Sequence, residues 1–310
     1  MQKFRSNGKI LLTGEYAVLN GAKSLALPTK MGQSMEVSEA QKNRISWTSY
    51  DENDNIWFQS DFEFENGDFT HIISLEDQKD LEKQEIAKRL RQILKVAFSK
   101  NSEAFSDKGY IIKTKLGFNR KWGLGTSSTL INNLAQWLKI DPYYLLQNSF
   151  GGSGYDIAAA GSNLPITFQL TDNGPVNFTA DFNPTFKEEL FFVYLNRKQN
   201  SREAIAHYRN QPMEDIQGLT DKISGITEQI IKSESLEEFK IFLKAHETLI
   251  SKVINIPRIQ TELFSDYPGM IKSLGGWGGD FILATGMEEE KEYFRKKGYH
   301  SIFDYQDLIK

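Results

Sequence analysis

Gly123-Leu124-Gly125-Thr126-Ser127-Ser128 is the stretch of the sequence that says most about the fold. Its glycines let the backbone approach a phosphate closely, and its hydroxyl groups can bind a phosphate or a metal ion. A helix that starts directly after it adds unpaired N–H groups and the positive end of a helix dipole. The alternative is an N-capped helix after a tight turn, which the glycines alone would favour. Neither common nucleotide fingerprint is present, because no Lys follows the last Gly and Ser128 occupies the third Gly position of Gly-x-Gly-x-x-Gly.

The residues after this stretch have helical periodicity. A helix is predicted to begin near Thr126, because its apolar residues recur on one helical face, at Leu130, Leu134, Trp137 and Leu138. Asp141 then fits the N-cap, and Pro142 the first helical position, of a second short helix.

Helices and strands alternate along the rest of the chain, which predicts a mixed α+β fold in two domains. Turn signals at 172–175 and 183–184 place a boundary near residue 185, between an N-terminal domain of residues 1–185 and a C-terminal domain of residues 186–310. Strands are predicted at 10–13, 34–38, 44–50, 56–60, 110–114, 166–170, 191–195 and 281–284, and further helices at 78–100, 201–209, 213–232, 236–256 and 288–297.

The composition excludes several classes of protein. The 310 residues carry 37 Lys and Arg against 41 Asp and Glu, a net charge of −4, so a nucleic-acid-binding surface is not expected. The chain contains no Cys, which rules out disulfides, thiolate metal sites and a Cys nucleophile. No apolar run approaches the length of a membrane span and no targeting signal is visible, so the cytoplasm is the expected location. No interface is evident, and a monomer or a homodimer is expected.

A second glycine-rich stretch, Gly151-Gly152-Ser153-Gly154-Tyr155-Asp156, delivers one carboxylate. Small residues leave room for a ligand beside Asp156, which suits a general base or a metal ligand. The alternative, favoured for the stretch in isolation, is a flexible loop whose Asp caps a helix at 157–161. Tyr155 stands where a serine-hydrolase elbow needs Gly, so that active site is excluded.

Two further segments carry candidate functional residues. Gly275-Gly276-Trp277-Gly278-Gly279-Asp280 precedes a strand, and it can close over phosphates or pack two backbones together. The alternative is a simple turn into the strand, and neither is favoured. Lys9 lies at the edge of an apolar strand that leads into a Gly14-Glu15-Tyr16 turn, where a solvated strand end is the commoner situation. The four His residues show no metal-binding spacing, and each is interpreted as structural.

Taken in order, these segments resemble the GHMP kinase superfamily, which is named for galactokinase, homoserine kinase, mevalonate kinase and phosphomevalonate kinase. Residues 8–19, 123–128 and 275–280 look like its motifs one, two and three, and Gly-Tyr-Asp-Ile-Ala at 154–158 resembles the catalytic-Asp segment of the mevalonate branch, closely that of a bacterial subgroup named for this pentapeptide. The resemblance implies an N-terminal α+β domain with a left-handed βαβ unit, a ferredoxin-like C-terminal domain, and a cleft for ATP and the acceptor.

The resemblance also implies residue roles. Asp156 matches the catalytic base, Lys9 the lysine paired with it, and Ser127 the ligand of a Mg²⁺ ion, while residues 123–128 would wrap the phosphates of ATP. The positions that match substrate-side segments are Glu15, Tyr16, Ser153, Asn200, Ser201, Arg202 and Gly278. Asn200 with Glu203 is equally well explained as a helix cap.

Two departures from the family pattern concern metal binding and the phosphate loop. Leu145 stands where mevalonate kinases have a second Mg²⁺-binding Glu, so the ion would rest on Ser127 and the phosphates. Residues 119–122, Asn-Arg-Lys-Trp, lack the usual Pro before the glycines of motif two.

The sequence therefore predicts an ATP-dependent kinase of the mevalonate pathway with a small anionic acceptor. The Gly14–Tyr16 turn and Gly278-Gly279-Asp280 resemble phosphomevalonate kinases, whereas Asp156 with Lys9 resembles mevalonate kinases. Phosphomevalonate is the slightly favoured acceptor. The alternatives are a nucleotide-binding homologue without turnover, which Leu145 and Trp277 favour, and a relative of the diphosphomevalonate decarboxylases. Basic residues expected to hold the acceptor are Arg120, Lys121, Arg197, Lys198 and Arg202.

Overall fold

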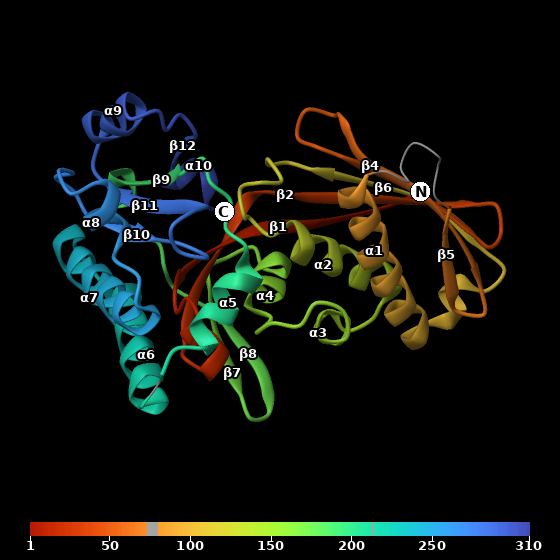
Figure 1. Ribbon diagram of the computed structural model, residues 1–310, viewed down its shortest axis with the longest axis horizontal. Helices are drawn as coiled ribbons and strands as arrows, with labels where there is room; N and C mark the ends of the chain where they lie inside the picture. Colours follow the sequence, from red (N-terminus) through yellow and green to blue (C-terminus); the bar gives the residue numbers. More distant parts are fainter. Residues whose placement is uncertain (73–79, 213) are drawn as a thin grey trace. The chain divides into compact units, whose positions relative to one another are not determined.

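The computed structural model describes residues 1–72, 80–212 and 214–310, which form two compact units (Figure 1). The chain passes between the units several times. The first unit holds Met1–Gly8, Met31–Arg120 and Gly125–Gly161, and the second holds Lys9–Lys30, Lys121–Leu124 and Ser162–Lys310. These units are not the sequence segments 1–185 and 186–310, whose boundary stays a prediction.

The first unit is built on a mixed sheet. Its strands run in the order β5-β4-β3-β6-β2, with β1 beside β2; β3 and β6 are parallel, and the pairs β2–β6, β3–β4 and β4–β5 are antiparallel. In the loop between β3 and β4, the Asp51 carboxylate accepts hydrogen bonds from the backbone N–H groups of Asn53 and Asn55. The strands are β1 (Gln2–Thr13), β2 (Ser24–Ala40), β3 (Arg44–Tyr50), β4 (Ile56–Glu65), β5 (Asp68–Ile72) and β6 (Gly109–Leu116).

Helices cover one face of this sheet and enclose the core of the first unit (Figure 1). The apolar stripe of α1 (Leu81–Lys100) is buried as its periodicity predicts, and Asp80 caps its N-terminus. Residues 78 and 79, where the helix was expected to begin, lie outside the described residues. The helix α2 (Thr126–Leu138) begins at the predicted residue, and η3 (Ser102–Phe105) precedes β6.

Two short helices complete the first unit. Asp141 accepts a hydrogen bond from the N–H of Tyr143, and Pro142 is the first residue of α3 (Pro142–Gln147), as predicted. The helix α4 (Tyr155–Gly161) begins two residues before the expected start at 157.

The second unit contains a small antiparallel sheet in the order β10-β11-β9-β12. The sequence predicted β9 and β11, but β10 and β12 are three residues each and too short to show a period. The N-terminal part of β2 also pairs with β7, and β7 with β8. The strands are β7 (Ile166–Thr171), β8 (Gly174–Thr179), β9 (Leu190–Tyr194), β10 (Ile271–Ser273), β11 (Phe281–Thr285) and β12 (Ile302–Asp304).

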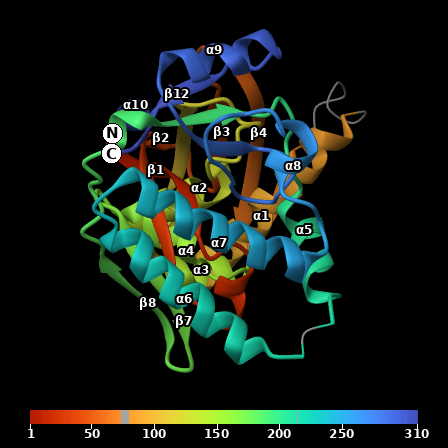
Figure 2. The same ribbon diagram turned by 90° about the vertical axis from the view of Figure 1, so that its left-hand side faces the viewer.

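The helices of the second unit surround two apolar clusters. Figure 2 shows α6 and α7 side by side, and both contribute to the cluster around Tyr16 and Trp277. Met213, the expected start of α6, lies outside the described residues; Asp215 caps the helix one residue before it begins. The helices are η1 (Ala17–Asn20), η4 (Lys187–Glu189), α5 (Ser201–Arg209), α6 (Ile216–Lys232), α7 (Leu236–Ile254), α8 (Ile259–Leu263), α9 (Glu288–Lys296) and α10 (Tyr305–Leu308). Within the described ranges, no helix combines the length and the apolar character that crossing a bilayer requires.

Candidate functional site

The N-terminus of α2 is open. Gly125 occupies the N-cap position with φ +98°, a left-handed conformation that favours glycine, and no described side chain caps this helix end. The hydroxyls of Ser128 and Thr129 turn inward and donate to the carbonyl of Gly125, at 3.0 and 2.9 Å, whereas Ser127 is exposed. The first turn therefore leaves its N–H groups to an outside acceptor, which is the arrangement that attracts a phosphate.

Lys9 holds the base of the same loop within the second unit. Its ammonium donates to the carbonyl of Gly123 at 3.0 Å, and its backbone N–H donates to the carbonyl of Leu124 at 3.0 Å. Lys9 is half-buried. It is therefore not the solvated strand end that its position alone suggested.

Trp122 anchors the loop where the family usually has Pro. Its ring lies 5.0 Å from the ring of Phe303, 6.0 Å from Phe281 and 6.3 Å from Tyr194, so it packs on one face of the small sheet. The Tyr194 hydroxyl donates to the carbonyl of Lys121 at 3.3 Å. Aromatic packing thus fixes the entry to the loop in place of a rigid ring in the backbone.

The segment Gly275–Asp280 packs two backbones together, one of the roles that the sequence left open. The N–H of Asp280 donates to the carbonyl of Arg197 at 2.7 Å, and the Gln199 side chain donates to the carbonyl of Trp277. A Cβ on Gly279 would lie 2.7 Å from the Arg197 carbonyl oxygen, so only glycine allows this approach. Trp277 is buried among the residues that pack around Tyr16.

Asp280 places a carboxylate against Gly123, the first residue of the glycine-rich loop. Its side chain is 8% exposed, and a Cβ on Gly123 would lie 2.7 Å from its Cγ. Its Oδ1 accepts a hydrogen bond from the backbone N–H of Gln199 at 3.1 Å. Burial raises the pKa of Asp280, and the Gln199 N–H and the charges of Lys9 and Lys198 oppose that rise.

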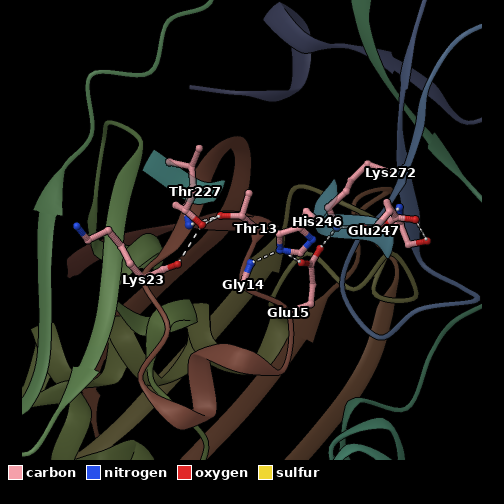
Figure 3. A network of polar contacts seen from close by, with 10 residues as sticks. Thr13, Gly14, Glu15, Lys23, Thr227, His246, Glu247 and Lys272 are labelled. Atoms are coloured by element: carbon pink, nitrogen blue, oxygen red, sulfur yellow. Dashed lines mark hydrogen bonds and ion pairs between the residues drawn. The ribbon is translucent and has the colours of Figure 1, made fainter. Parts of the chain in front are cut away.

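Glu15, expected on the substrate side, lies inside a buried polar cluster of the second unit (Figure 3). Its Oε1 is 2.5 Å from the Lys272 ammonium, which also lies 3.3 Å from Glu247. Glu247 in turn accepts hydrogen bonds from the N–H and the hydroxyl of Ser273. Burial raises the pKa of Glu15 to about 7, against the lowering effect of Lys272.

His246 fixes the turn that contains Glu15. Its Nε2 accepts a hydrogen bond from the N–H of Gly14 at 2.9 Å and lies 3.4 Å from the second carboxylate oxygen of Glu15. Burial, together with the charge of Lys272, holds the pKa of His246 well below its usual value. The ring is therefore neutral with its proton on Nδ1, consistent with the structural role expected for it. The neighbouring Tyr16 stacks on Tyr208 at 5.3 Å.

Asp156 lies in the first turn of α4, in the first unit, where its Oδ1 accepts a hydrogen bond from the N–H of Ile157 at 3.1 Å. The preceding Gly151 and Gly152 have φ of +69° and +111°, and a Cβ on either would meet nothing within 4 Å. Ser153 is buried. The space that the sequence predicted is present around the two glycines, and the pairing of Asp156 with Lys9 stays a prediction.

Of the other expected acceptor residues, Asn200 is a helix cap. Its side chain accepts from the N–H of Arg202 at 3.1 Å and donates to Glu203 at 2.6 Å, which confirms the cap. Ser201 and Arg202 are exposed in the first turn of α5. A Cβ on Gly278 would lie 3.2 Å from the side-chain nitrogen Nε2 of Gln199. Roles for these residues toward an acceptor remain predictions.

A metal ion would find few protein ligands. The described part of the chain contains no group of three or more His, Asp or Glu side chains suited to a metal, and Leu145 is part of the core of the first unit. The exposed hydroxyl of Ser127 fits a Mg²⁺ ion that is held mainly by phosphate oxygens.

The chain resembles known proteins in its structure. No protein-family model and no curated protein matches the sequence. Solved structures do match: a mevalonate kinase from Methanococcus jannaschii has 16% identity and a TM-score of 0.66, covering 97% of this chain and 96% of that one. A Streptococcus pneumoniae phosphomevalonate kinase in complex with phosphomevalonate and AMPPNP has 15% identity and a TM-score of 0.67, covering 96% of each chain. This chain has the GHMP kinase fold. A Lactococcus lactis galactokinase complexed with galactose shares the GHMP kinase fold at 13% identity and a TM-score of 0.63, covering 100% of this chain and 93% of that one.

Sequence reasoning missed the structural positions of three residues. Asp280 lies beside Gly123, Lys272 pairs with Glu15, and Trp122 packs at the entry to the loop. Asp280 had one signal, an acid directly after a run of glycines, and Gly278 was named in its place. Lys272 had none, because its partner Glu15 is 257 residues away in the chain.

Proposed function

We propose that this chain is an ATP-dependent small-molecule kinase of the mevalonate pathway, which transfers the γ-phosphoryl group of ATP to phosphomevalonate or mevalonate. The open N-terminus of α2 carries the proposal, because unpaired N–H groups behind Gly125 suit the phosphates of a nucleotide. The fold supports a kinase, and the same position in the sequence matches motif two.

The roles proposed for individual residues follow the chemistry of phosphoryl transfer, which depends on positioning and charge stabilisation. Lys9 stabilises charge at the base of the loop, where its ammonium contacts Gly123. Ser127 would hold a Mg²⁺ ion, which would supply positive charge to neutralise the phosphates. Asp156 removes the proton of a hydroxyl acceptor, a task that matters less for a phosphate acceptor because phosphate is largely ionised at neutral pH.

An acceptor with a negative charge fits the basic residues near these segments. Arg197 and Lys198 precede α5, and Arg202 lies exposed in its first turn. A charge-assisted pair with a carboxylate or phosphate fixes the orientation of an acceptor. Phosphomevalonate is the first candidate and mevalonate the second.

One observation favours a second candidate function, a nucleotide-binding protein without turnover. Leu145 is fully buried in the core of the first unit, so the position of the second metal-binding Glu cannot contribute a ligand. The two functions differ in whether ADP accumulates.

The test is ADP release with mevalonate, phosphomevalonate, diphosphomevalonate, homoserine and galactose, in parallel with direct ATP binding. We expect turnover with phosphomevalonate or mevalonate, and a sharp loss of ATP affinity in Gly125→Val with an unchanged circular dichroism spectrum. ATP binding without ADP release for any acceptor would favour the second function. Carbon dioxide release from diphosphomevalonate would identify a decarboxylase instead.

For a hydroxyl acceptor, Asp156→Asn should lower turnover by about 10²–10⁴ with ATP binding nearly unchanged. Lys9→Met should cost a similar factor, and the double variant little more than either change alone if the two act as a unit. Additive losses would show that Asp156 and Lys9 act independently.

A further inference from the structure

One buried carboxylate of the second unit has no role in the chemistry above. Asp280 is 8% exposed, and its Cγ and Oδ2 both lie 2.7 Å from where Gly123 would carry a Cβ. A Cβ on Gly275 would lie 3.3 Å from the same Oδ2. The carboxylate is therefore flanked by two residues that have no side chain, and one of them is the first residue of the proposed phosphate loop.

The backbone around Asp280 is built to hold this side chain in place. Asp280 has φ +52°, a left-handed conformation that is uncommon for residues with a Cβ, although Asp and Asn tolerate it best. Its N–H is bonded to the carbonyl of Arg197 and its carbonyl accepts from the N–H of Leu195 at 2.8 Å. Its Oδ1 is bonded to the N–H of Gln199. Three backbone contacts thus fix the direction of a single carboxylate.

Burial opposes the charge of this carboxylate, and two ammonium groups favour it. The Lys9 ammonium, which also donates a hydrogen bond to the carbonyl of Gly123, and the Lys198 ammonium both act on it electrostatically. A buried charge costs free energy unless it is paired, so a neutral residue would fit the same place at lower cost. A negative charge kept next to a phosphate loop also repels the phosphates that the loop attracts.

We propose that Asp280 is a specificity-determining residue, whose charge makes the loop at Gly123 favour the magnesium complex of ATP over metal-free ATP. The inference rests on the proposed function, because it requires ATP to bind at this loop. The magnesium complex carries less negative charge than metal-free ATP, so a fixed carboxylate penalises the metal-free form more. Leu145 stands at the position of the second metal-binding Glu and cannot bind a cation. The negative charge of Asp280 favours a nucleotide whose charge is partly offset by a bound cation.

The test measures the dissociation constants of ATP with MgCl₂ and of ATP with EDTA by isothermal titration calorimetry. Asp280→Asn keeps the shape, the left-handed backbone and an acceptor for the Gln199 N–H, and it removes the charge. We expect the preference of the wild type for the magnesium complex to shrink by about tenfold, mainly because metal-free ATP binds more tightly. Asp266→Asn is the matched control, an exposed carboxylate that bonds to Tyr293, and it should leave the ratio unchanged.

A purely structural role of Asp280 would weaken both forms of ATP by the same factor, and that result would overturn the inference. An unchanged ratio would overturn it as well. Asp280→Gly is the second variant, because glycine fits φ +52° without strain and removes the same charge, and the two variants should shift the ratio alike. Failure of both to fold would assign Asp280 to folding and would also overturn the inference. Absence of ATP binding to the wild type would instead contradict the proposed function.

Discussion

Glu15 and Asp280 are both buried carboxylates of the second unit, and their surroundings differ in kind. Glu15 is 1% exposed and faces the ammonium of Lys272 at 2.5 Å, with the neutral ring of His246 on its other side. Asp280 instead lies between Gly123 and Gly275, which offer no side chain at all. A carboxylate enclosed by a cation serves the fold, whereas the Asp280 carboxylate is packed against the backbone of the loop that begins at Gly123.

The largest effect is expected from removing the cation that faces Glu15. Lys272→Met leaves Glu15 and Glu247 buried without their common cation, and removing one partner of a buried ion pair costs about 3–5 kcal/mol. Urea unfolding should show this loss of stability. The matched control is Lys240→Met, whose exposed pair with Glu237 should contribute under about 1 kcal/mol. Equal losses in both variants would mean that the buried cluster does not stabilise the fold.

The pH dependence of stability tests the same cluster. The pKa of Glu15 is raised in the folded state to about 7 from an ordinary value of 4.5, so the folded state binds the extra proton. Its contribution is fully present below pH 4.5 and is lost as the pH rises toward 7, at about 1.4 kcal/mol per pH unit. The lowered pKa of His246 acts with the opposite sign, as its stability contribution is lost when the pH falls below 6.5.

Comparing wild type with Glu15→Gln cancels the contribution of His246, which is present in both. We expect the stability advantage of the wild type over Glu15→Gln to fall by roughly 2–3 kcal/mol between pH 5 and pH 8, measured by urea unfolding. An advantage that grows with pH would show that Glu15 is ionised throughout this range.

A smaller effect on stability is expected at Gly123, one of the two glycines beside Asp280. Gly123 and Gly151 both have φ +69°, so Ala strains the backbone of each equally. Only at Gly123 does the new methyl group meet the Asp280 carboxylate, whereas at Gly151 it meets open space. Gly123→Ala should therefore destabilise the protein by about 1–3 kcal/mol more than Gly151→Ala, and it should also weaken ATP binding. Similar stabilities would show that the contact between Gly123 and Asp280 relaxes easily.

The smallest effect concerns the residue after Gln199, whose N–H holds Asp280. Asn200→Ala removes the N-cap of α5 and should cost about 1 kcal/mol of stability. If the cap is the whole role of Asn200, the Michaelis constant for the acceptor stays unchanged in steady-state assays. A rise in that constant, with Asn200→Ser as the capping control, would show contact with the acceptor.

Local signals predicted much of the fold. The strand Arg44–Tyr50, the helix Ser201–Arg209 and the start at Pro142 agree with the structure, because alternation, periodicity and caps are properties of neighbouring residues. The strand Gly174–Thr179 was missed, since its residues read as turn followed by a mixed pattern. The start of α2 at Thr126 was also predicted, whereas the binding of phosphates at residues 123–128 stays a prediction.

The support of the site could not be predicted in the same way. Glu15 was assigned to the substrate side because its position matches a substrate-side segment of the family, and only the fold brings Lys272 to it across most of the chain. Trp122 was counted as a departure from the family, yet its ring packs against Phe303. Contacts between distant residues leave no periodic or compositional trace, so a single sequence contains no signal for them.

The aromatic packing of Trp122 also makes the loop observable by optical spectroscopy. The fluorescence of an indole ring responds to small changes in its surroundings. Trp122 directly precedes Gly123 in the chain, and its ring lies 6.3 Å from the ring of Tyr194. Excitation energy can pass from this tyrosine to the nearby tryptophan, so no added fluorescent label is needed. Any rearrangement of residues 123–128 on ligand binding thus reaches a native chromophore, and Trp122→Phe supplies the background from the other four tryptophans. The residue that replaces a proline in the family pattern gives this chain a built-in fluorescent reporter.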